Sequence, residues 1–292
     1  MSVLTEDFTI QFGDSGVVLN TEIVPGTPFV DLTKITGLDN APVDSSDRQR
    51  EGMDGGFVDS EFESIRSIVL EGTVYGSEYD VELYLDQLKS NYAPSRTSKP
   101  LYVMLPGVGQ RVMFCKSMGC RYDIDQLRRV GSVNIQITLK AEDPTIHGPE
   151  IIASAFLGTL AGYGRGYDKA YDYGYGGAGQ RGPSASIDNV GNRPASAILR
   201  IYGPVTNPAI YHDQTDSAMS FNIVLEVGDV LDVDLRNRSV MLNGTANRRG
   251  SLLGRAPWFM LVPGINTFRF DGNQHVVDPA TRLDIVTRPA YR

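Results

Sequence analysis

The sequence is poor in the residues on which most enzymes and metal sites depend. Its 292 residues include three histidines, two cysteines and one tryptophan. It contains no HExxH, no GxSxG and no Gly-rich phosphate loop with its lysine. We therefore expect no cofactor, no metal site and no enzymatic activity.

Long apolar runs are also missing. The longest candidate, IIASAFLGTLAG at 151–162, contains two glycines and falls short of the roughly 20 residues that cross a bilayer. The first residues, MSVLTEDFTIQF, lack the basic start and apolar stretch of a secretory signal. We expect synthesis in a cytoplasm and no membrane insertion.

The two cysteines lie five residues apart in FCKSMGCRYD, with no CxxC pattern and no neighbouring histidine. A closed zinc site needs four ligands, which are usually arranged in close pairs. We expect Cys115 and Cys120 to be small, partly buried thiols on adjoining strands rather than a disulfide.

The tetrapeptide Gly-Asp-Ser-Gly at 13–16 resembles the nucleophile motif of serine proteases. A nucleophilic serine needs a histidine within hydrogen-bond reach, and His147, His212 and His275 all follow Ser15, contrary to the trypsin-like order. Apolar alternation on both sides favours a hairpin turn. A hydrolase using Ser15 stays a remote alternative.

Three further features admit functional and structural interpretations. Asp229, Asp232 and Asp234 could suggest calcium, but the spacing departs from a calcium loop and favours a solvated strand face. Asn243-Gly244 is typical of a hairpin turn. Trp258 lies in an apolar run that indicates a buried strand, although an exposed tryptophan could stack on a sugar.

Acidic residues are concentrated in the first half of the chain. Residues 1–148 hold 22 Asp and Glu against 13 Lys and Arg, a net charge of −9, and residues 149–292 hold 13 against 14. Binding to nucleic acid through phosphate contacts needs clustered cations. The first half therefore does not look like a DNA-binding surface, although DNA could pass close to it without adhering.

Period-two alternation of apolar and polar residues dominates the chain. In SVNIQITLK, Val133, Ile135, Ile137 and Leu139 alternate with polar residues, which predicts a half-buried strand. LYVML and RVMFCK indicate a hairpin. One helix is expected over 77–92, capped by Ser77 and ended by Pro94. The protein is predicted to be all-β with one packed helix.

Two stretches do not fit a compact domain. Residues 37–60 carry six acids, two arginines and few large apolar residues, which indicates a functional or disordered arm. Residues 162–183 set five tyrosines in glycine, which indicates a linker or a contact surface. We predict a first domain over 1–148, a linker over 149–189 and a β-sandwich over 190–292.

The order of landmarks along the chain resembles the distal tail proteins of bacteriophages with long, non-contractile tails. The acidic arm, the predicted helix and the following segments occur in that family's order: ITGLDNAPV (35–43), IRSIVLEGTVYG (65–76), PLYVMLPG (100–107), AEDP (141–144), NRPASAILRIYGPVTNPAI (192–210), FNIVLEVGDVLDVDLRNRSVMLNG (221–244) and PWFMLVPGINTFRF (257–270). The resemblance covers almost the whole chain and excludes the Gly/Tyr segment.

The resemblance implies a structural virion protein of the tail tip or baseplate. Its first domain would be a split-barrel or β-sandwich that forms a homohexameric ring around the DNA channel, and its second a galectin-like sandwich projecting outward. Partners would be the tail tube protein, the tail hub or tail-associated protein, and receptor-binding proteins. The arm would bury Leu38, Val43, Met53, Phe57 and Val58 against a neighbouring copy.

Sugar-binding galectins carry a His-x-Asn-x-Arg strand, which this chain lacks. We therefore expect the second domain to be a spacer or a docking platform. The alternative is a carbohydrate-binding tail accessory or adhesin that uses Trp258 or the Gly/Tyr segment.

Overall fold

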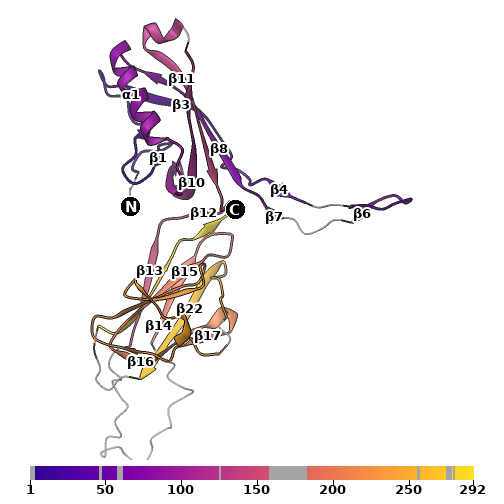
Figure 1. Ribbon diagram of the computed structural model, residues 1–292, viewed down its shortest axis with the longest axis vertical. Coiled ribbons are helices and arrows are strands. Elements are labelled where there is room, and N and C mark those ends of the chain that lie inside the picture. The colour runs from indigo at the N-terminus through magenta and orange to yellow at the C-terminus, as the bar shows by residue number, and fades with distance from the viewer. Residues whose placement is uncertain are drawn as a thin grey trace, which may run out of the picture. The chain divides into compact units, whose positions relative to one another are not determined.

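The computed structural model describes residues 4–45, 48–57, 62–124, 126–157, 183–254, 257–273, 278 and 280–292. The chain divides into two compact units, Met1–Pro149 together with Tyr291–Arg292, and Glu150–Ala290 (Figure 1). Both are built almost entirely of β-strands, and the described residues form one α-helix, α1 (Glu78–Asn91). The predicted all-β class with one packed helix is confirmed.

The first unit is a nine-stranded antiparallel sheet in the order β2-β1-β9-β10-β11-β8-β3, in which β12 also pairs with β10 and β24 pairs with β12. Its strands are β1 (Ile10–Phe12), β2 (Val18–Leu19), β3 (Phe29–Thr36), β8 (Arg66–Tyr75), β9 (Lys99–Leu105), β10 (Gly109–Tyr122), β11 (Ser132–Ala141), β12 (Ile146–His147) and β24 (Ala290–Tyr291).

Strand β10 connects the two halves of this sheet. Its first part pairs with β9 and its second part with β11, and the register shifts between Ser117 and Gly119. Apolar side chains of β1 and β9, such as Phe12 and Leu101, share one core with those of β8 and β11. The sheet must therefore curve around this core, in agreement with the predicted barrel-like or sandwich-like first domain.

Helix α1 covers the same core. The Ser77 hydroxyl accepts a hydrogen bond from the Asp80 amide at 3.2 Å, which caps the helix. Val81, Leu85 and Leu88 are buried, and the Tyr92 ring stacks on Phe12 with 5.4 Å between the ring centroids. The predicted helix is confirmed within one residue at each end.

The second unit is a sandwich of two antiparallel sheets. One has the order β13-β23-β15-β19-β20-β21, and the other has β14-β22-β16-β17 with β18 beside β16. The strands are β13 (Ile151–Phe156), β14 (Ser184–Asn189), β15 (Ala197–Tyr202), β16 (Val205–His212), β17 (Ser217–Ser220), β18 (Val224–Leu225), β19 (Val230–Asp234), β20 (Ser239–Leu242), β21 (Ala246–Asn247), β22 (Gly264–Asn273) and β23 (Arg282–Thr287).

The sandwich core takes side chains from both sheets. Leu199, Leu231 and Ile285 of one sheet and Ile210 and Phe268 of the other are fully buried in one cluster. Three short 3-10 turns complete the described elements: η1 (Gln126–Val130), η2 (Asp213–Thr215) and η3 (Arg249–Ser251).

The predicted linker differs from the structure at both ends. β13 and β14 fall inside residues 149–189, yet they pair with β23 and β22 of the second unit. Each is only six residues long; β13 is apolar at all positions except Ser154, whereas β14 is apolar only at Ala185 and Ile187, so the neighbours in the sheet decide the state of each. The Gly/Tyr segment at 162–182 lies outside the described residues, and Tyr291–Arg292 belong to the first unit.

The cysteines do not lie on adjoining strands. Cys115 and Cys120 both belong to β10, which continues through the irregularity at Gly119 instead of turning. Gly119 has a φ of 120°, a backbone conformation that favours glycine. Both thiols are free, and burial raises the pKa of Cys115 to about 12 and that of Cys120 to about 11.

Candidate assembly surfaces

The predicted arm is a two-stranded ribbon inserted between β3 and β8. β4 (Val43–Asp44) pairs with β7 (Phe62–Glu63), and farther out β5 (Arg48–Gln49) pairs with β6 (Gly56–Phe57). We call residues 43–63 the arm ribbon; it extends away from the sheet of the first unit (Figure 1). At its turn, the Arg50 amide donates to the Gly55 carbonyl at 3.2 Å, and Gly52 and Gly55 have positive φ angles of 75° and 97°.

The root of the arm ribbon is tightly built. Gly37 has a φ of 85°, and a Cβ at this position would lie 2.0 Å from the Ser67 carbonyl oxygen. The fully buried Arg66 donates from Nη1 to the carbonyls of Gly37, at 3.3 Å, and Leu38, at 3.1 Å. A charged donor on two adjacent carbonyls fixes the point where the chain leaves the sheet.

Leu38 belongs to this root and not to the exposed surface. It is partly buried and packs against the core of the first unit. Of the five predicted interface residues, Val43, Met53 and Phe57 are exposed by 51, 75 and 61%. Val58 lies outside the described residues.

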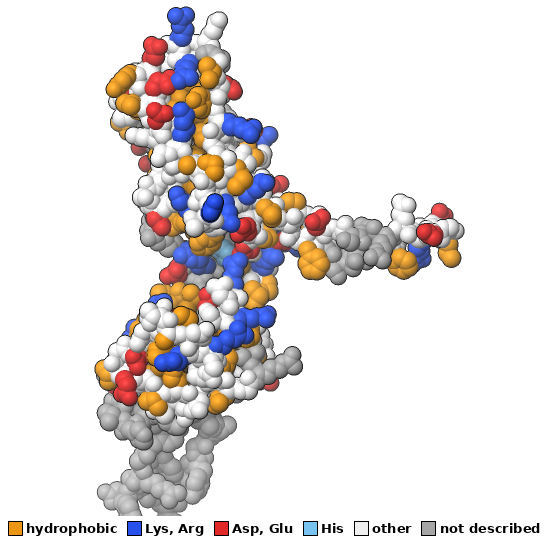
Figure 2. Space-filling view, in the orientation of Figure 1, with side chains coloured by type: hydrophobic (Ala, Val, Ile, Leu, Met, Phe, Trp, Pro, Cys, Tyr) orange, Lys and Arg blue, Asp and Glu red, His pale blue; other side chains and the backbone are white. Residues whose placement is uncertain are grey.

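Sequence reasoning missed Phe62, which is 70% exposed on β7. Phe62 lies between Glu61 and Glu63, and a single phenylalanine among acidic residues shows no periodicity from which an exposed contact residue could be predicted. A two-stranded ribbon has no core of its own in which to bury such side chains. Apolar side chains are therefore exposed along the arm ribbon (Figure 2), which makes it a candidate contact surface.

The Gly-Asp-Ser-Gly motif is a turn, as predicted. β1 and β2 pair antiparallel on either side of it, and the Gly16 amide donates to the Gly13 carbonyl at 3.3 Å. The Tyr102 hydroxyl donates to Asp14 at 2.6 Å. His147 lies 3.6 Å from Asp143, and His275 lies outside the described residues.

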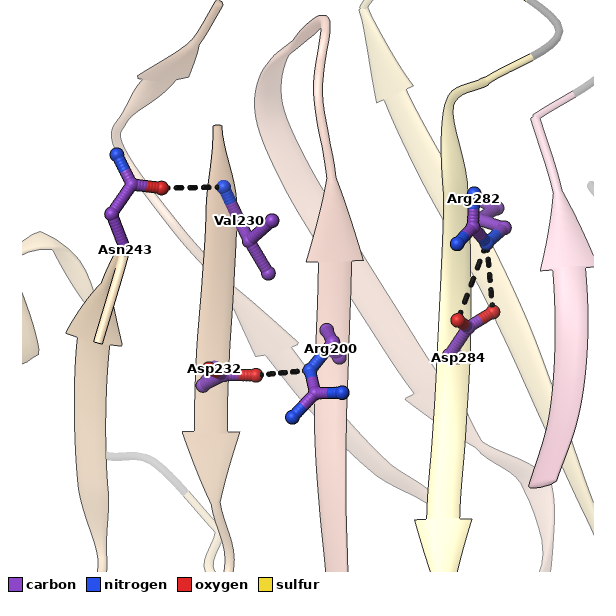
Figure 3. Close-up of polar contacts among 6 residues, drawn as sticks. All are labelled: Arg200, Val230, Asp232, Asn243, Arg282 and Asp284. Carbon is purple, nitrogen blue, oxygen red and sulfur yellow. Dashed lines mark hydrogen bonds and ion pairs between the residues drawn. The ribbon is translucent and has the colours of Figure 1, made fainter. Parts of the chain in front are cut away.

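The aspartates around β19 are held separately from one another. Asp232 pairs with Arg200 at 2.6 Å across the sheet (Figure 3). Asp229 instead accepts a hydrogen bond from Asn243 Nδ2 at 2.9 Å. The Asn243 hydrogen bond lowers the pKa of Asp229. The strand-face interpretation is confirmed, and the described residues hold no group of three His, Cys, Asp or Glu side chains that could bind a metal ion.

Asn243-Gly244 forms the predicted turn between β20 and β21, with φ angles of 51° and 67°.

The prediction of a buried strand at Trp258 is wrong. Pro257 and Pro263 lie at the two ends of this segment, and proline has no backbone N–H to donate to a neighbouring strand. Within the segment only Leu261 forms a β-bridge, and its partner is Ala195. Trp258 is half-buried against the core, 5.6 Å from the Arg249 guanidinium.

The outer face of the six-stranded sheet carries a row of paired charges. Beside Arg200 and Asp232, Arg282 donates to both carboxylate oxygens of Asp284 at 3.1 and 3.2 Å (Figure 3). The Ser154 hydroxyl also donates to Asp284, and the Arg282 guanidinium lies 3.8 Å from the Tyr202 ring centroid. These partners come from the chain itself, so the face satisfies its own charges.

A comparison with protein families bears on the second unit. Residues 190–280 match the family described as siphovirus-type tail component, C-terminal domain. Over these residues the second unit is similar to that domain. Within the described residues, no helix is long and apolar enough to cross a membrane.

Solved structures extend the likeness to the whole chain. The crystal structure of SPP1 Dit, described as a paradigm of the hub adsorption apparatus in phages that infect Gram-positive bacteria, is 15% identical with a TM-score of 0.65. The match covers 97% of this chain and 98% of that one. The baseplate of phage P2 in its activated conformation with Ca is 11% identical with a TM-score of 0.55, covering 96% and 97%.

No curated protein sequence matches the chain. At these identities the structures show a shared fold. Together with the family match, the fold confirms the predicted resemblance to the distal tail proteins and supports a bacteriophage tail hub or baseplate component.

Proposed function

We propose that this chain is a structural subunit of the phage tail tip, and that six copies form a ring between the tail tube and the tail hub or baseplate. One observation carries the proposal. On a chain with the fold of a Dit hub protein, the arm ribbon leaves four large apolar side chains more than half exposed: Val43, Met53, Phe57 and Phe62.

A ring follows from the kind of contact that an arm makes. An arm that binds a different surface on the next copy makes a heterologous contact, and repeated heterologous contacts close into a ring when the rotation is right. The number six comes from the family resemblance. Burying the arm ribbon's apolar side chains against a neighbour supplies the free energy of association.

The first unit would surround the channel through which DNA passes. Residues 1–148 hold 22 carboxylates against 13 basic residues, and without the arm ribbon at 43–63, which holds seven against two, an acidic excess of 15 against 11 remains. A negative wall repels phosphate, so the genome would pass without specific binding. The second unit would project outward as a docking platform for host-recognition proteins, and the role of the whole chain would be structural and not catalytic.

The mass of the purified protein in solution tests the ring. Light scattering should give a species near six times 31.9 kDa. A variant in which Asn-Gly replaces residues 44–62 should stay folded and monomeric, because Val43 and Glu63 lie opposite each other and a two-residue turn can join them.

The matched control is Leu253→Ser, which removes a 55% exposed apolar side chain from the second unit and should leave the mass unchanged. If the arm-shortened protein assembles as the wild type does, the arm has no part in the ring.

A further inference from the structure

The second unit contains a long run of sequence that carries no carboxylate. Residues 235–270 include six arginines and neither aspartate nor glutamate. Between positions 236 and 250, every exposed residue is Arg, Asn, Gly or Thr. The surface over these residues is therefore positively charged and polar.

The arginines of this run gather at one edge of the six-stranded sheet. Arg238 is the last residue before β20, and the Arg248 amide, directly after β21, donates to the Val240 carbonyl at 2.8 Å. Since Val240 follows Arg238 by two residues, the backbones of the two arginines lie within about 10 Å of each other. Arg249 begins η3 immediately afterwards. We call three residues the basic edge: Arg238, Arg248 and Arg249.

The basic edge differs from the sheet faces of the second unit in its ion pairing. Arginines on those faces have carboxylate partners, as in Arg200 with Asp232 and Arg269 with Asp213. Over the part of the chain that the structure describes, none of the three basic-edge arginines forms an ion pair. Residues 233–254 hold four arginines and one aspartate, so the net charge of this stretch is +3.

The backbone around the basic edge is held in place. Asp234, the one carboxylate of the stretch, accepts hydrogen bonds at Oδ1 from the Arg236 and Asn237 amides, at 2.9 Å each. These bonds fix the turn before β20. The Arg249 guanidinium lies 5.6 Å from the Trp258 ring centroid. A surface that is fixed before binding loses less entropy when a ligand binds it.

The chemistry of the basic edge selects a polar anion. A guanidinium group offers N–H donors in a planar fork that matches phosphate or carboxylate. The centre of a protein interface is apolar, whereas the exposed residues between 236 and 250 are not, so this surface suits an acidic protein segment poorly. Asn237 and Asn247 are exposed beside the arginines, and an amide side chain can both donate to and accept from hydroxyl groups.

We propose that the basic edge binds a phosphodiester-linked polymer of sugar or polyol units, as found at cell surfaces. The arginines would bind the phosphates, and the asparagine amides would bind the hydroxyl groups. This is a binding function of the second unit beyond a structural role. That the chain meets such a polymer rests on its proposed place at the tail tip.

Binding of the purified full-length protein to immobilised poly(glycerol phosphate), measured by surface plasmon resonance, tests the proposal. The edge variant carries Arg238→Gln, Arg248→Gln and Arg249→Gln. It should bind at least about tenfold more weakly than the wild type, and wild-type binding should weaken steeply as salt is raised, because phosphate contacts release counterions. Circular dichroism checks the fold, and light scattering should give the edge variant the mass of the wild type.

The matched control carries Arg96→Gln, Arg129→Gln and Lys140→Gln, which remove the same amount of charge from exposed positions of the first unit. Its affinity should stay within about twofold of the wild-type value, since none of these side chains would contact phosphate.

No saturable binding by the wild type would overturn the proposal, as would an edge variant that binds as the wild type does. Equal weakening of the edge variant and the control would assign the binding to net charge. Tighter binding of poly(glutamate) or duplex DNA, tested as competitors at equal charge, would overturn the ligand class. A chain that binds the polymer but stays monomeric contradicts the ring alone, and a chain that assembles without binding the polymer contradicts the basic edge alone.

Discussion

The two units differ in how completely each satisfies its own surface. The second unit pairs the charges of its exposed sheet face internally, as in Arg200 with Asp232 and Arg282 with Asp284. The first unit leaves apolar side chains exposed at two ends and carries most of the acidic excess. The second unit also exposes apolar side chains, such as Val227 and Ile265, so the exposed arm ribbon and the acidic excess are what set the first unit apart. This difference agrees with the proposal that the first unit makes the ring contacts.

Replacing a phenylalanine in the second core and one on the arm ribbon should give the largest difference in stability. Phe268 is fully buried in the second core, and Phe268→Ala should reduce the free energy of unfolding of that unit by about 3 to 5 kcal/mol. Urea titration followed by Trp258 fluorescence measures it, since the single tryptophan lies in the second unit. Phe57→Ala, on the arm ribbon, should change stability by less than about 0.5 kcal/mol and instead weaken assembly.

Replacing the arginine at the root of the arm ribbon and the arginine at its turn should lower the free energy of unfolding by clearly different amounts. Arg66→Ala leaves the Gly37 and Leu38 carbonyls without this donor inside the first unit and should cost about 3 kcal/mol. Arg50→Ala removes an exposed guanidinium that lies 4.7 Å from the Phe57 ring centroid and should cost less than about 0.5 kcal/mol. Urea unfolding measured by far-ultraviolet circular dichroism compares them; equal losses would contradict the buried role of Arg66.

A pair of glycines separates backbone strain from steric overlap. Gly26 and Gly37 have nearly the same φ, 83° and 85°, but an added Cβ meets nothing within 4 Å at Gly26 and backbone at 2.0 Å at Gly37. Gly26→Ala should lower the free energy of unfolding by about 1 to 2 kcal/mol, because alanine is strained in the left-handed backbone region. Gly37→Ala should cost about 2 kcal/mol more. Thermal unfolding compares the two variants. Similar melting temperatures would show that the backbone around Gly37 shifts at little cost to make room for the added Cβ.

The smallest expected effect is a loss of stability of the second unit at low pH, caused by protonation of His212. The ring is buried between Phe259 and Phe268, and its Nε2 lies 3.0 Å from Asn266 Oδ1. Burial lowers the pKa of His212 from its ordinary value of 6.5, against the opposing effects of Asn266 and Asp213. The unfolded chain therefore binds the proton more readily, so stability is complete above pH 6.5 and falls as pH decreases toward the folded pKa.

Urea midpoints from Trp258 fluorescence at pH 7.5 and 5.5 measure this loss. His212→Gln, which cannot titrate, should show a smaller difference between the two pH values. An equal difference in both proteins would assign the pH dependence to other groups.

The features that the sequence predicts well are those with strong local patterns. The helix at 77–92 combines a serine cap, a spaced apolar stripe and a terminating proline. β11 alternates over nine residues, so its buried face could be predicted residue by residue. The family resemblance supplied the expectation of an arm, and the exposed side chains Val43, Met53 and Phe57 fit it.

The failures occur where tertiary neighbours decide the structure. Cys115 and Cys120 share a strand because Gly119 continues it through an irregularity, which no periodicity reveals. Leu38 looks like part of the arm but packs on the core, because Arg66 and Gly37 hold the chain there. Ile124, Leu127 and Val130 lie three residues apart on and beside η1, a spacing equally typical of a buried turn and of an exposed one. Only exposure separates the two possibilities.

The last two residues of the sequence return to the unit in which the first ones fold. Tyr291 lies 3.8 Å from the Arg111 guanidinium, and Arg292 pairs with Glu63 at 2.8 Å. The segment 150–290 is thus an insertion within a single host domain, held by the chain at two points. After a cut at either point alone, the segment would still be joined to the first unit at the other point. Exchanging one continuous stretch of the gene would combine the same first unit with a different second unit.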